Sequence, residues 1–109
     1  MHHVIYDKLK SIAKEQKCIY YSEIAPLANL DMDSPADRNK ISEILGEISS
    51  YEHEHGRPML SAVVIHKENN IPGKGFFTLA RELDLYSGND DWNFFISELR
   101  KVHGYWGKK

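Results

Sequence analysis

The chain has 109 residues, of which 41% are hydrophobic and 11% aromatic, and this length and composition are typical of one domain with a single core. Its formal net charge of -2 excludes attachment to nucleic acid or an anionic membrane through overall charge alone, so any such binding must be local. The single cysteine cannot form an internal disulfide, and no stretch approaches the roughly 20 apolar residues of a transmembrane helix.

The first third of the chain predicts two helices separated by a short extended segment. Apolar residues at helical spacing predict a helix over residues 3–16. Aromatic and β-branched residues in 17–21 favour an edge strand. Ser22 is a suitable N-cap for a short helix over residues 23–29, although Pro26 fits only its first turn.

The clearest helix signal lies at Ser34 and Pro35, which combine a serine cap with proline at the first helical position. The spacing of the following apolar residues predicts a long helix that ends near residue 55, before Gly56. Gly46 lies inside this helix, and we expect it to mark close packing against a neighbour.

A nearly continuous apolar run over residues 59–66 predicts a buried strand at the centre of the sheet. Residues 67–75 have the composition of an exposed turn, interpreted here as a hairpin tip. Residues 76–85 fit either a strand or a helix, and the spacing of their apolar residues favours a helix after a brief extended start. A last helix follows, with Trp92, Phe95, Ile96, Leu99 and Val102 on one face, and a tail over 104–106 packs back on the core.

The order of these elements resembles the winged helix-turn-helix superfamily over roughly residues 4–78. The resemblance implies an α+β fold: a mostly helical winged-helix-like domain with a small two- or three-stranded β-sheet. The whole chain, 1–109, would form this one domain, with a C-terminal helical extension over about 76–106. Members of this superfamily present the second of two adjacent helices to DNA.

Residues 20–25 and 57–64 also look similar to the DNA-binding domain of alkyltransferase-like proteins. However, the Pro-Cys-His-Arg type of motif found in alkyl-accepting members is absent, and Cys18 lies far upstream of the corresponding region. We therefore do not carry alkyl transfer over to this chain.

The winged-helix resemblance implies a DNA-binding domain with a regulatory or accessory role. The helix that would enter a groove begins at Pro35, and its first turns carry cationic and amide side chains suited to phosphate and base contacts. Two lysines in the expected hairpin tip would reach neighbouring phosphates. The predicted DNA-binding residues are Arg38, Asn39, Lys40, Lys67 and Lys74. An ordinary solvated helix face is the alternative interpretation of the same residues.

A protein-interaction adaptor, or a small subunit built on the same framework, is the alternative function. Residues 30–66 carry more acidic than basic side chains, and complementary charge would then select the partner. Exposed aromatic residues near the C-terminus would anchor the contact, unless they only cover the edge of the core. The residues assigned to this partner surface are Glu43, Glu47, Glu54, Tyr105 and Trp106.

We predict neither an enzyme nor a metal or cofactor site. His53 and His55 are two positions apart and do not share a helix face, so they lack the spacing of a zinc helix. Residues 72–75 resemble a phosphate-binding loop only weakly, and a simple turn explains them. Cys18 has no local histidine base. Because the chain start also lacks the features of a secretory signal, we expect a cytoplasmic protein without membrane contact.

Overall fold

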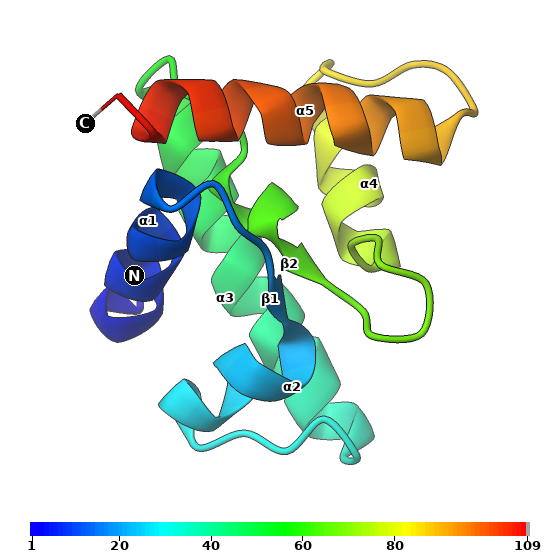
Figure 1. Cartoon of the computed structure of the whole chain (residues 1–109). Helices are drawn as coiled ribbons and strands as arrows, with labels where there is room; N and C mark the ends of the chain where they lie inside the picture. Colours follow the sequence, from blue (N-terminus) through cyan, green and yellow to red (C-terminus); the bar gives the residue numbers. More distant parts are fainter. Residues whose placement is uncertain (109) are drawn as a thin grey trace.

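The computed structural model describes residues 1–108. It shows an α+β fold that is mostly helical, with a two-stranded sheet, arranged as in Figure 1. The elements in chain order are α1 (His3–Lys14), β1 (Ile19–Tyr20), α2 (Tyr21–Ile24), η1 (Ala25–Ala28), α3 (Pro35–Glu54), η2 (Leu60–Val63), β2 (Val64–Ile65), α4 (Lys74–Glu82) and α5 (Asp91–Trp106), where η denotes a 3-10 helix.

The buried segment 59–65 forms the centre of the molecule. It passes between three helices, because η2 contacts α1, α3 and α5 (Figure 1). Every residue of this segment is buried. The predicted central position of this run is therefore confirmed.

The predicted strand over 59–66 is largely wrong, because residues 60–63 form η2 and only Val64 and Ile65 form a strand. Periodicity does not distinguish a buried strand from a buried helical turn in a run that is apolar on all sides. The backbone polar groups are satisfied without a sheet at this point: the Ser61 amide donates to Ser49 Oγ at 3.0 Å. The sheet has two strands, with β1 parallel to β2 and Ile19 paired with Val64.

The expected hairpin is absent from residues 1–108, although the turn itself is present. The His66 amide donates to the Ile71 carbonyl at 2.9 Å, and Asn70 adopts a left-handed φ of 59°. The chain then enters α4 directly, so the favoured helical interpretation of 76–85 is confirmed but its brief extended start is not. Phe76, Phe77 and Ala80 are the buried residues of this helix.

The N-terminal half follows the predictions more closely. Helix α1 buries Ile5, Leu9 and Ala13 but ends at Lys14, before Gln16 with its left-handed φ. Ser22 is not an N-cap: α2 begins at Tyr21, two residues before the predicted start, and the Glu23 carboxylate accepts the Tyr20 amide at 3.2 Å. The second predicted helix is in fact α2 followed by the 3-10 turn η1.

The long helix α3 begins at Pro35 as predicted, with the Ser34 hydroxyl accepting from the Asp37 amide at 3.4 Å. Helix α5 also lies where it was expected, with Phe95 and Val102 buried; Trp92 is 53% exposed and does not face the core. None of the helices within residues 1–108 is long and apolar enough to cross a membrane.

Candidate functional site

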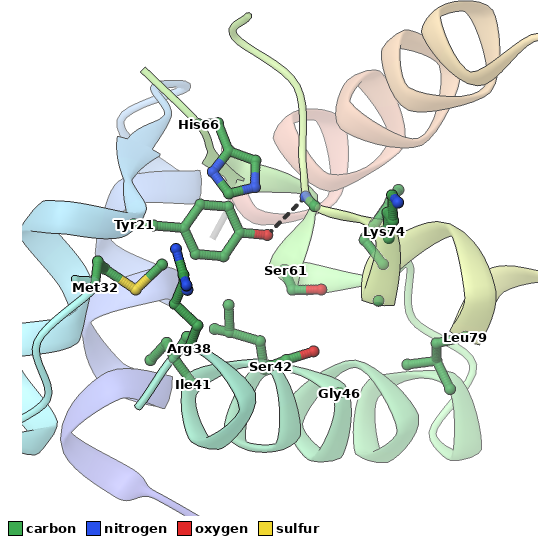
Figure 2. A pocket seen from close by; sticks show the side chains of 14 residues that line it. Tyr21, Met32, Arg38, Ile41, Ser42, Gly46, Ser61, His66, Lys74 and Leu79 are labelled. Atoms are coloured by element: carbon green, nitrogen blue, oxygen red, sulfur yellow. Dashed lines mark hydrogen bonds between the residues drawn. The ribbon is translucent and has the colours of Figure 1, made fainter. Parts of the chain in front are cut away.

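A pocket of about 340 Å³ lies between α3, η2 and the start of α4, and we call it the central pocket (Figure 2). Its walls come from segments that are distant in sequence. The lining residues are Tyr21, Met32, Arg38, Ile41, Ser42, Leu45, Gly46, Ser61, His66, Gly73, Lys74, Gly75, Phe76 and Leu79.

Tyr21 and His66 hold one wall of the central pocket together. Their rings stack with centroids 4.3 Å apart. The Tyr21 hydroxyl accepts the Gly73 amide at 2.9 Å, which fixes the chain just before α4 (Figure 2). Burial raises the pKa of Tyr21, and the bond from Gly73 offsets part of this increase. The phenol is therefore neutral at physiological pH and keeps its own hydrogen to donate.

Two glycines allow the start of α4 to approach this wall and α3. A Cβ atom at Gly73 would lie 3.0 Å from His66 Nε2, and one at Gly75 would lie 2.5 Å from Ser42 Oγ. These distances are shorter than ordinary van der Waals contacts. The segment that resembled a phosphate-binding loop thus uses glycine for close packing of the backbone.

Gly46 has a different role from the one predicted. A Cβ atom at this position would meet only Leu79 Cδ2, at 3.9 Å, an ordinary contact. Gly46 therefore does not mark tight helix packing. Instead, its missing side chain leaves room for the central pocket, to whose lining it belongs.

The five residues predicted to bind DNA are all exposed, but the structure groups only three of them. Arg38 and Lys74 line the central pocket. Arg38 also lines an adjoining side depression of about 450 Å³, together with Lys67. We call Arg38, Lys67 and Lys74 the basic rim. They come from α3, the turn after β2, and the start of α4, respectively.

The basic rim has no salt bridge with a carboxylate anywhere in residues 1–108. Lys67 Nζ lies 5.8 Å from the centroid of the Tyr20 ring, a cation–π distance. Asp33 and Glu68 also line the side depression, so the surface around Lys67 is mixed in charge. Arg38 lines this mixed side depression as well as the central pocket, whereas Lys74 lines only the central pocket.

The other two predicted residues stand apart from both hollows. Asn39 and Lys40 are exposed on the first turns of α3 but line neither the central pocket nor the side depression. Lys40 Nζ lies 3.9 Å from Glu43 Oε2, and both side chains are exposed. A pair of this kind contributes little and leaves the lysine available.

The acidic and aromatic residues of the alternative partner surface are not equally accessible. Glu43 and Glu54 are exposed. Glu47 is exposed but pairs with the amino group of Met1 at 2.8 Å, which lowers the pKa of its carboxyl group. Trp106 is only 9% exposed and belongs to the core. Of the two interpretations of Trp106, the exposed anchor is wrong and the residue that covers the edge of the core is confirmed, because α5 turns its indole inward.

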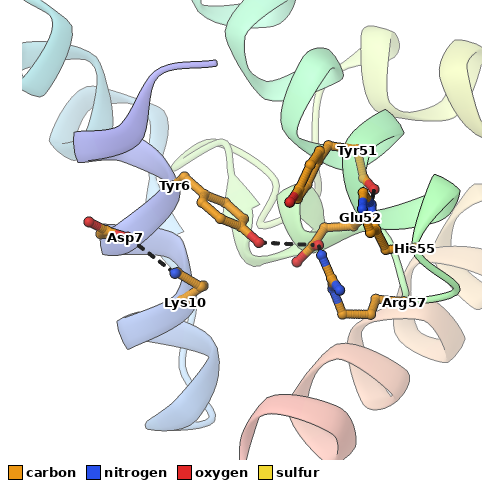
Figure 3. Close-up of polar contacts among 7 residues, drawn as sticks. All are labelled: Tyr6, Asp7, Lys10, Tyr51, Glu52, His55 and Arg57. Atoms are coloured by element: carbon orange, nitrogen blue, oxygen red, sulfur yellow. Dashed lines mark hydrogen bonds and ion pairs between the residues drawn. The ribbon is translucent and has the colours of Figure 1, made fainter.

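A second polar cluster ties α1 to the end of α3, as Figure 3 shows. Glu52 is fully buried, and its Oε2 accepts from Arg57 Nε at 2.6 Å and from the Tyr6 hydroxyl at 3.3 Å. Burial raises the pKa of Tyr6, with a further contribution from the Glu52 charge. The hydrogen bond to Glu52 raises the pKa of Arg57. This cluster joins elements of the fold and does not reach the central pocket.

The histidines near the end of α3 make local contacts. His55 Nδ1 lies 2.8 Å from the Tyr51 carbonyl oxygen, and the two ring centroids are 4.2 Å apart. Within residues 1–108, no group of three or more His, Cys, Asp or Glu side chains is placed to hold a metal ion. Cys18 is partly buried, and burial raises the pKa of its thiol.

The sequence did not indicate Tyr21, Ser42 or His66 as site residues. Tyr21 falls in the predicted edge strand over 17–21, and His66 falls at the end of the predicted buried strand over 59–66. Tyr21 and His66 stack beside the pairing of β1 with β2, and Tyr21 accepts a hydrogen bond from Gly73, 52 positions away. The local signal in the sequence was the glycine-rich segment 72–75. Its glycines indicate close packing against another segment but do not identify that segment.

Comparisons with protein-family models, with curated proteins and with solved structures found no match to this chain. A function must therefore be inferred from the geometry of the chain itself.

Proposed function

We propose that this domain binds duplex DNA in a regulatory or accessory role, through the basic rim and the exposed first turns of α3. The observation that carries the proposal is that Arg38 shares the central pocket with Lys74 and the side depression with Lys67, and that none of the three forms a salt bridge within the described residues. Phosphate contacts need this kind of local positive charge, whatever the net charge of the domain.

The order of α2, η1 and α3 supports the resemblance to a helix-turn-helix unit, with α3 as the helix that approaches DNA. Arg38, Asn39 and Lys40 lie on its first turns, where such helices contact base edges and phosphates. In this proposal the turn after β2 and the start of α4 replace a β-hairpin wing. Lys67 and Lys74 then contact the flanking phosphates.

The test is the salt dependence of binding to a short fluorescent duplex, measured by anisotropy. The wild-type chain should bind at low ionic strength, with affinity falling as salt increases. Replacing Arg38 or Lys74 with alanine should weaken binding and reduce the salt slope by about 0.9 for each phosphate that is no longer neutralised. Arg100→Ala is the matched control, because Arg100 is an exposed arginine on α5 outside both hollows.

Two results would overturn the proposal. One is the absence of duplex binding by the wild-type chain at low salt. The other is an equal salt slope for Arg38→Ala, Lys74→Ala and Arg100→Ala, which would mean that the basic rim makes no specific contribution. Either result would favour the adaptor function, whose predicted acidic residues Glu43, Glu47 and Glu54 are all exposed.

A further inference from the structure

The central pocket combines an apolar wall with cationic groups near its entrance. Its apolar side is formed by residues of α3 and α4, including Ile41, Leu45, Phe76 and Leu79. In Figure 2, Arg38 and Lys74 lie on opposite sides of the pocket, with Ser42 and Gly46 on the α3 side between them. A ligand in this space would contact hydrocarbon from α3 and α4 and would have a cationic side chain on either side of it.

We infer that the central pocket binds a small organic anion with an apolar body and one carboxylate group. The volume of about 340 Å³ lies at the small end of the range of about 300–1,000 Å³ for ligand pockets, which favours a compact body such as fused aromatic rings. The carboxylate pairs with Arg38, whose planar guanidinium matches it in a bidentate arrangement. Lys74 adds a positive charge on the opposite side of the pocket.

The two cationic side chains and the Tyr21 hydroxyl favour an acceptor on the ligand, while the Ser42 hydroxyl can either donate or accept. Arg38 and Lys74 carry donors only. The Tyr21 hydroxyl already accepts the Gly73 amide, and its hydrogen is left to donate. A carboxylate is an acceptor with two oxygens, so it would pair with the Arg38 guanidinium, whereas a cation or a ligand that only donates would not. Charge and hydrogen-bonding capacity thus select the same class of ligand.

Ligand binding is tested directly with 2-naphthoate as the probe, and with 2-naphthamide as its uncharged analogue of the same shape. Calorimetric titration gives the affinities, and amide chemical shifts give the position. The amides of Gly46, Gly73 and Gly75 should shift, because these glycines line the pocket. Those of Gly88, Gly104 and Gly107 should not. Naphthoate should bind at least about tenfold more tightly than naphthamide, as expected for one charge-assisted contact.

Three variants separate the contributions of charge and space. Arg38→Gln should weaken naphthoate about tenfold or more and leave naphthamide nearly unchanged. Lys40→Gln is the matched control, since Lys40 is exposed on the same helix but does not line the pocket. Gly46→Leu should block both ligands, because the added side chain fills the space beside Leu79; retained amide dispersion would confirm that this variant folds.

The inference is overturned if naphthoate shifts none of the three pocket glycines. It is equally overturned if naphthoate and naphthamide bind alike, or if Arg38→Gln and Lys40→Gln have the same effect. None of these measurements involves DNA. Ligand binding to the central pocket can therefore be observed even if the chain does not bind DNA. A consequence that does rest on the proposed function is competition: a bound carboxylate neutralises Arg38 and should displace a fluorescent duplex, whereas naphthamide should not.

Discussion

At the scale of single residues, the hydroxyl pair of Ser49 and Ser61 supports the centre of the molecule. The two Oγ atoms are 2.6 Å apart, and Ser49 Oγ also accepts the Ser61 amide at 3.0 Å. Both residues are buried. Because Ser49 satisfies a backbone donor that no strand partner reaches, it allows this segment to form η2 instead of a longer strand.

Replacing Ser49 with alanine should therefore cost more than replacing Ser61. Ser49→Ala leaves the buried Ser61 amide without its acceptor, and the expected decrease in the free energy of unfolding is about 1–3 kcal/mol. Ser61→Ala retains that amide bond and should cost less. Urea denaturation of both variants checks the order. Equal decreases would contradict the assigned role of the amide bond.

Some residues of the candidate site can be predicted from the sequence alone, and others cannot. Exposure and charge identified Arg38, Lys67 and Lys74, since charged residues in a helix start and a turn are rarely buried. The identity of their neighbours was not accessible. Tyr21 and His66 meet through a parallel pairing of β1 with β2, and no local pattern encodes which distant segments become adjacent.

At the scale of elements, local signals predicted the start of α3 correctly but not the start of α2. The start of α3 is fixed by Ser34 and Pro35, whose effects act within one helical turn. The run over 59–65 was correctly predicted to be buried, but its 3-10 helix η2 was not predicted. Its geometry is imposed by the three helices around η2, and tertiary context of this kind overrides strand propensity.

Gly46 permits a prediction about α3 as an element. Because a Cβ atom there meets only Leu79 Cδ2 at 3.9 Å, Gly46→Ala should stabilise the protein by about 0.5–1 kcal/mol through its greater helix propensity. Gly56→Ala is the matched control of opposite sign, since Gly56 has a left-handed φ of 73° and alanine is strained there. Thermal unfolding measures both. A destabilised Gly46→Ala variant would mean that the wall of the pocket is packed more tightly than described.

At the scale of the whole molecule, α5 belongs to the same core as the N-terminal elements. It contacts both α1 and η2 and buries Phe95, Val102 and Trp106. Its buried Glu98 accepts the Met59 amide at 2.9 Å, directly before η2. The helical extension expected from sequence is thus integral to the fold, and its indole at Trp106 closes one edge of the core.

Removing α5 should consequently abolish cooperative folding. A chain ending at residue 90 would expose the apolar surface of α1 and η2 and leave the Met59 amide without its acceptor. Many small domains have only about 5–15 kcal/mol of stability, and removal of three buried aromatic or aliphatic side chains approaches that total. A chain ending at Trp106 keeps α5 and is the matched control. Circular dichroism should show a sharp thermal transition for the control and none for the shorter chain. A sharp transition for the shorter chain would instead mean that residues 1–90 contain a sufficient core, with α5 packed against its surface.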